Sequence, residues 1–94
     1  MNHRYYVLLY DTVENYVERR VPYRDAHLGY GNAAHERGEL VMGGALAEPA
    51  DAAILVFRAD GPAVAEDFAK NDPYVKAGLI KKWAVRPWTV VIGG

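Results

Sequence analysis

The run Tyr5–Tyr10 (YYVLLY) constrains this chain more than any other segment, because it consists entirely of residues that favour β-strands. Side chains alternate between the two faces of a strand, so Tyr5, Val7 and Leu9 share one face and the remaining three share the other. Both faces are therefore apolar, and monomers rarely expose apolar patches of that size. The strand must be covered on both sides.

Length and composition limit the kind of fold that can bury this strand. With 94 residues, of which 51% are hydrophobic, the chain predicts one folded domain over residues 1–94 with a single core. The absence of cysteine excludes disulfides, thiolate metal sites and thiol catalysis.

Charge and hydropathy exclude two classes of partner. The net charge is −1, with scattered basic residues, whereas nucleic-acid-binding surfaces usually gather Lys and Arg, so no nucleic-acid partner is expected. No apolar run reaches the roughly 18 residues of a membrane span, and residues 1–4 do not begin a secretion leader, so we expect no membrane association and a cytoplasmic location.

Turn signals divide the rest of the chain into helices and strands. After a loop to Val21, Pro22 starts the main helix, with an apolar stripe of Tyr23, Ala26, Leu28, Tyr30, Gly31 and Ala34 and an end at Gly38. A second helix follows Pro62, and a short third one has Asp72 as its cap and ends at Gly78. The further strands are predicted at Leu40–Leu46, bulged at Gly43–Gly44, at Ala53–Phe57, and from Lys81 to Ile92, where Pro87 indicates either a sheet edge or a bulge.

This order, βαββαβ, predicts an α+β ferredoxin-like fold. Its four-stranded antiparallel sheet carries both long helices on one face. The helix-free face would then leave apolar side chains in water, and a second copy of the chain is the simplest cover. We therefore expect a homodimer through the helix-free sheet face.

Several short motifs in the same order resemble the YCII-related proteins, a family of dimeric α+β barrels similar to muconolactone isomerase. They are Arg24-Asp25-Ala26-His27-Leu28, Gly38-Glu39-Leu40 with Gly43-Gly44, Asp72-Pro73-Tyr74, Ala77-Gly78-Leu79 and Arg86-Pro87-Trp88. The resemblance implies a ferredoxin-like homodimer whose pocket holds a paired histidine and aspartate. His27 and Asp72 fall at those two positions, and Arg24 falls at a commonly basic position. Some members remove HCl from a chlorinated hydroxyhydroquinone ring.

His27 and Asp72 each have a structural and a functional interpretation. A histidine can transfer protons near neutral pH, and a carboxylate can orient its ring and stabilise its charged form. His27 can equally be a histidine packed on a helix face. Asp72 can be only an N-cap, or it can cap with one carboxylate oxygen while the other faces His27.

Arg24 and Tyr74 are the candidate substrate-binding residues. Arg24 lies one helical turn from His27 and could hold an anionic group, or it could be a solvated surface arginine. Tyr74, with Tyr6, Tyr10, Trp83 and Trp88, could wall a pocket or belong to the core. His27 and His35 point about 80° apart on an ideal helix and, with His3, show no metal-ligand spacing, so no metal is expected.

Two functions follow. The first is a cofactor-free lyase of the dehydrochlorinase type, or an isomerase, acting on a small cyclic or aromatic acidic substrate through His27 and Asp72. The alternative is a non-catalytic dimeric module that binds a small molecule or a protein. Catalysis requires the two side chains to lie within hydrogen-bond reach in a cleft.

Overall fold

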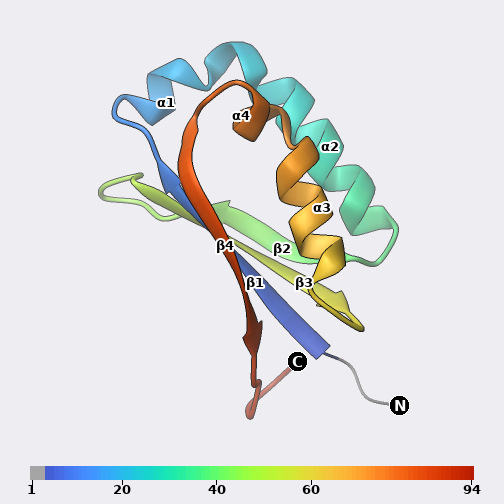
Figure 1. Cartoon of the computed structure of the whole chain (residues 1–94). Helices are drawn as coiled ribbons and strands as arrows, with labels where there is room; N and C mark the ends of the chain where they lie inside the picture. Colours follow the sequence, from blue (N-terminus) through green and yellow to red (C-terminus); the bar gives the residue numbers. More distant parts are fainter. Residues whose placement is uncertain (1–3) are drawn as a thin grey trace.

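The computed structural model describes residues 4–94, so His3 lies outside the described part (Figure 1). No helix in that part has the length and apolar character that a membrane span needs. In chain order the elements are β1 (Arg4–Thr12), α1 (Tyr16–Arg19), the 3-10 helix η1 (Val21–Tyr23), α2 (Arg24–Glu36), β2 (Leu40–Ala45), β3 (Ala52–Ala59), α3 (Ala63–Asn71), α4 (Pro73–Lys76) and β4 (Ile80–Trp88).

The four strands form one antiparallel sheet in the order β2-β3-β1-β4. The doubly apolar strand β1 is central, with Leu8 opposite both Leu55 of β3 and Val85 of β4. Helices α2 and α3 lie on the same side of the sheet and leave the other side bare (Figure 1). The predicted ferredoxin-like βαββαβ fold is confirmed.

The core lies between the sheet and α3. Tyr6, Leu8 and Tyr10 of β1 turn toward the helices and are almost completely buried. The ring of Phe68, from α3, packs against the ring of Phe57, with 5.2 Å between the ring centroids. The buried face of α3 consists of Ala65, Phe68 and Ala69, which are 0–4% exposed.

The predicted apolar stripe of the first long helix is wrong in part. Only Ala34 of α2 is buried, whereas Tyr23 and Leu28 are more than 40% exposed. The helix also begins at Arg24 rather than Pro22, which lies in η1. Helix α2 and the edge strand β2 together line a cleft, so part of the stripe faces this cleft instead of the core.

Two strand details also differ from the sequence prediction. The irregularity in β2 lies between Leu40 and Met42, not at the glycine pair. Strand β4 ends at Trp88 rather than Ile92, because its pairing with β1 ends where Trp88 faces Tyr5. β4 is an edge strand, as Pro87 indicated.

Candidate functional site

A cleft of about 540 Å³ opens between α2 and the strands β2 and β3, on the helix-covered side of the sheet. Its size falls within the range of small-molecule sites. The side chains that matter below come from all around it: Tyr10, Tyr16, Arg20, Arg24, His27, Asn32, His35 and Tyr74.

Asp72 lies behind His27, outside the lining of the cleft, at the junction of α3 and α4. Its Oδ1 accepts a hydrogen bond from the backbone N–H of Tyr74 at 3.0 Å, so Asp72 is the N-cap of α4, as predicted. Pro73 occupies the first turn, where a missing N–H costs nothing. The carboxylate is fully buried, which is unusual for an aspartate that serves only as a cap.

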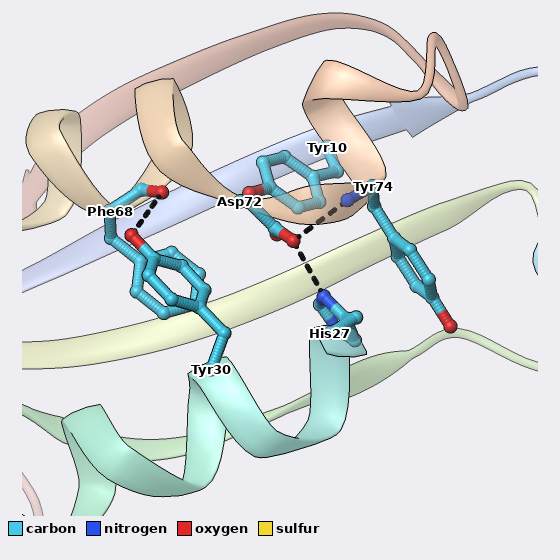
Figure 2. A network of polar contacts seen from close by, with 6 residues as sticks. All are labelled: Tyr10, His27, Tyr30, Phe68, Asp72 and Tyr74. Carbon is cyan, nitrogen blue, oxygen red and sulfur yellow. Dashed lines mark hydrogen bonds and ion pairs between the residues drawn. The ribbon is translucent and has the colours of Figure 1, made fainter. Parts of the chain in front are cut away.

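His27 approaches Asp72 from α2, across 45 residues of sequence. Its Nδ1 lies 2.7 Å from Oδ1 of Asp72 (Figure 2). The expectation that one carboxylate oxygen caps while the other faces His27 is wrong, because Oδ1 does both. The second oxygen, Oδ2, instead accepts a hydrogen bond of 2.7 Å from the hydroxyl of Tyr10.

Three donors from three elements therefore meet on one buried carboxylate: the Tyr10 hydroxyl, the His27 imidazole and the Tyr74 amide. Burial, together with the charge of Asp72 and the hydrogen bond to it, raises the pKa of Tyr10 well above its ordinary value. Tyr10 thus remains a neutral donor across the physiological range. This arrangement fixes the carboxylate in position toward His27.

The imidazole of His27 is oriented from two sides. Its ring stacks on that of Tyr74, with centroids 3.7 Å apart and planes within 5° (Figure 2). Donation from Nδ1 to the carboxylate leaves Nε2 as the basic nitrogen of the neutral ring. Within residues 4–94 no buried side-chain nitrogen or oxygen lacks a hydrogen-bond partner, and Nε2 makes no hydrogen bond there, so this atom is not fully buried. An accessible base beside a buried carboxylate can accept and return a proton.

Residues 4–89 match the sequence profile of the YCII-related domain, which is nearly the whole chain. The chain belongs to the YCII-related family. No curated protein matches the sequence significantly.

A solved structure similar to this YCII-related chain is 5-chloro-2-hydroxyhydroquinone dehydrochlorinase from Burkholderia phenoliruptrix AC1100, in complex with 2,5-dihydroxybenzoquinone. The two share 20% sequence identity and superpose with a TM-score of 0.75 over 90% of this chain and 93% of the other. At that identity the likeness establishes the common fold.

The two predicted substrate-binding residues lie at the same end of the cleft in this YCII-related structure. Both Arg24 and Tyr74 line it. Tyr74 is only 2% exposed, and its ring packs between His27 on one side and the edge of Tyr16 on the other. Burial raises the pKa of Tyr74, which Arg20 and Arg24 partly offset. The ring of Tyr74 therefore supports His27.

The other predicted aromatic residues separate into two groups. Tyr10 lines the cleft, whereas Tyr6, Trp83 and Trp88 do not. The sequence pattern put Tyr10 on the same strand face as Tyr6 and Leu8, but it gave no sign that its hydroxyl would bind Asp72. Arg20 was also missed, because the sequence placed it in a loop, and the structure separates it from α2 by η1.

His35 lies at the other end of the cleft. Its Nδ1 is 2.7 Å from the carbonyl oxygen of Leu40, and because a carbonyl can only accept, this nitrogen carries the proton. Within residues 4–94, no three His, Asp or Glu side chains gather as metal ligands would.

Proposed function

We propose that this YCII-related protein is a cofactor-free acid–base enzyme, a lyase of the dehydrochlorinase type or an isomerase, acting on a small cyclic or aromatic acidic substrate. The observation that supports it most is the 2.7 Å contact between His27 and a buried carboxylate that two other donors hold. A histidine whose Nε2 faces an aromatic-walled cleft has the reach and the chemistry of a general base.

In this mechanism His27 is the catalytic base and Asp72 stabilises it. Nε2 takes a proton from a ring hydroxyl or an acidic carbon of the substrate, and the electron pair left behind enters the ring system. Chloride then leaves in an elimination, or His27 returns the proton to a different carbon in an isomerisation. Neither reaction needs an external oxidant or reductant, so no cofactor or metal is required. Asp72 stabilises the imidazolium throughout, as carboxylates do in other His–Asp pairs.

Arg24 and the Tyr74 hydroxyl are the proposed substrate contacts. A guanidinium at the cleft stabilises negative charge that develops on the ring oxygens during proton removal. Since Arg24 begins α2 one turn before His27, both side chains reach the same part of the cleft.

The test is a panel of chlorinated hydroquinones, hydroxylated aromatics and unsaturated lactones. Chloride release is followed with an ion-selective electrode, and double-bond shifts by ultraviolet absorbance. Turnover that His27→Gln abolishes while the variant keeps the wild-type melting temperature supports the enzyme. Binding of panel members without turnover, in both proteins, would favour the non-catalytic binding module instead.

We also propose that the chain forms a homodimer through the helix-free sheet face. The register places seven apolar or aromatic side chains on this open face: Tyr5, Val7, Leu9, Met42, Ile54, Val56 and Trp88. Among them Met42 is 66% and Trp88 50% exposed, and exposed large apolar side chains gathered on one face are typical of an interface. The same register also places Arg58 and Arg86 on this face, where Arg58 donates a hydrogen bond to the Tyr5 hydroxyl. A second copy of the same patch would cover it by two-fold symmetry. A cytoplasmic location remains the expectation from the sequence.

Light scattering at micromolar concentration tests the dimer. The wild type should have twice the chain mass, and Leu9→Asp with Ile54→Asp should give a monomer. Val91→Asp is the matched control, since Val91 is equally apolar and 83% exposed but lies beyond the sheet. A wild-type chain that runs as a monomer would refute this assembly.

A further inference from the structure

Two arginines lie together at one end of the cleft. Arg20 directly follows α1, and Arg24 begins α2, four residues later. Both line the cleft. The guanidinium carbon of Arg20 lies 5.1 Å from the centre of the Tyr16 ring, which in turn packs edge-on against Tyr74 at 5.8 Å between centroids. Because Tyr74 stacks on His27, the arginines lie at the end of the cleft where the base is.

Neither arginine has a carboxylate partner within residues 4–94. The ion pairs there are Arg37–Glu39, Lys82–Asp11 and His27–Asp72. None of the described residues that line the cleft is an aspartate or a glutamate. Arginine stays protonated at any physiological pH, so this end of the cleft holds two uncompensated positive charges side by side.

An aromatic ring supports the half-buried Arg20, whereas Arg24 is exposed at the rim of the cleft. The Tyr16 ring under Arg20 is 5% exposed and therefore a fixed platform for a guanidinium. Both arginines also lower the pKa of Tyr74 against the larger effect of burial, which is consistent with their lying near its hydroxyl. The guanidinium groups of Arg20 and Arg24 and the hydroxyl of Tyr74 thus lie in one small region of an aromatic-walled cleft.

We propose that Arg20 and Arg24 form a carboxylate-binding subsite, and that the ligand of this cleft is a ring that carries a carboxylate. Guanidinium groups bind planar two-oxygen anions in a bidentate manner, which a single phenolate oxygen cannot match. Residues three apart on a helix have Cβ atoms about 5–6 Å apart, so a carboxylate held at Arg24 leaves the attached ring within reach of His27. The subsite rests on the proposed function only because both use the same cleft. A carboxylate can bind there whether or not the protein catalyses a reaction.

The test compares three probes that share one ring: 2,5-dihydroxybenzoate, 2,5-dihydroxybenzamide and hydroquinone. Isothermal titration of the wild-type chain should give about 10- to 100-fold tighter binding of the benzoate than of the amide, as expected for hydrogen bonds to a charged group. Raising the salt concentration should narrow that gap, because the arginines are partly exposed. Equal affinity for the benzoate and the amide would overturn the proposal.

Variants assign the preference to the two arginines. Arg20→Gln and Arg24→Gln should each reduce the preference for the benzoate to a few-fold, and should weaken binding of the amide much less than binding of the benzoate. Arg19→Gln is the matched control, because Arg19 is an exposed arginine of α1 outside the cleft lining. Arg20→Lys keeps the charge without the fork and should retain part of the preference. If Arg20→Gln kept the full preference with unchanged melting temperature, Arg20 would have no part in the subsite.

The same titrations on His27→Gln separate this proposal from the enzyme proposal. The variant should lack turnover and retain the preference for the benzoate. A protein that prefers the benzoate but converts no member of the panel would refute the enzyme and leave the carboxylate subsite standing. Turnover of neutral rings with no preference for the benzoate would refute the carboxylate subsite and support the enzyme.

Discussion

The two ends of α2 each bring a histidine to the same cleft, but the two imidazoles have different hydrogen-bond acceptors. His27 and His35 both use Nδ1 at 2.7 Å from an oxygen. For His35 that oxygen is the carbonyl of Leu40, five residues along the chain. For His27 it is a fully buried carboxylate 45 residues away.

The difference lies in the charge of the acceptor. A neutral carbonyl fixes the tautomer and the orientation of an imidazole, whereas a carboxylate also stabilises the imidazolium that forms when the ring takes a proton. His35 is held by its immediate chain neighbours, so its environment is local. His27 depends on β1, on the α3–α4 junction and on α4, so it can act as a base only in the folded molecule.

The largest expected effect is that of His27→Gln on turnover. A positioned general base contributes about 10²- to 10⁴-fold to a rate, and glutamine cannot replace it. The measurement is the initial rate on whichever panel substrate the wild type converts, with thermal melting as the control for folding. A variant that retains more than a third of the wild-type rate would place the base elsewhere.

Asp72→Asn tests the carboxylate while keeping the cap. Asparagine caps helices about as well as aspartate, so its side-chain oxygen can still accept from the Tyr74 amide. The charge that stabilises the imidazolium is lost, and we expect turnover to fall at least about tenfold, because the general base loses the group that stabilises its protonated form. Asp72→Ala should instead destabilise the fold, by about 3 kcal/mol or more, because three donors lose their acceptor. If Asp72→Asn kept full activity, Asp72 would be a cap alone.

Tyr10→Phe tests the support behind the carboxylate. Losing the hydroxyl leaves Oδ2 of Asp72 without its donor, and we expect a loss of about 1–3 kcal/mol in unfolding free energy at pH 7, measured by urea denaturation. The wild type should also lose stability as the pH rises above about 10, where tyrosines of the unfolded chain release protons while Tyr10 keeps its own.

The sign follows from proton linkage. Above that pH the unfolded chain binds fewer protons than the folded one, so the free energy of unfolding decreases with pH. The raised pKa of Tyr10 therefore stabilises the fold fully below about pH 10 and progressively less above it. The free energy of unfolding of Tyr10→Phe should decline less steeply than that of the wild type between pH 10 and 11.5. Parallel stability curves for the two proteins would contradict a buried, neutral Tyr10.

The smallest effect is expected at the other end of α2. His35→Leu removes the donor to the Leu40 carbonyl, for a loss of about 0.5–1.5 kcal/mol. Turnover should remain within about twofold of wild type, because an imidazole without a carboxylate partner has no proposed part in the reaction. A rate loss similar to that of His27→Gln would mean that acceptor charge does not distinguish the two histidines.

The sequence determined the architecture of this protein through local signals. The alternation of YYVLLY, the stops at Gly38 and Gly78 and the Asp72-Pro73 helix start each act within a few residues, and the structure bears them out. Gly38 and Gly78 both adopt positive φ angles of 83° and 77°, which glycine reaches without strain. Prediction was less accurate for α2, because the exposure of Leu28 depends on the open space over β2 and not on helical spacing.

Only the tertiary structure decided how the candidate site is assembled. The motif resemblance named His27 and Asp72, but the spacing of residues could not bring them together, since loop geometry and sheet order set that distance. It could not show that one oxygen serves both the cap and the histidine, or that Tyr10 holds the other. Helix and turn signals depend on neighbouring residues, whereas a buried carboxylate takes its donors from whichever elements the fold packs around it.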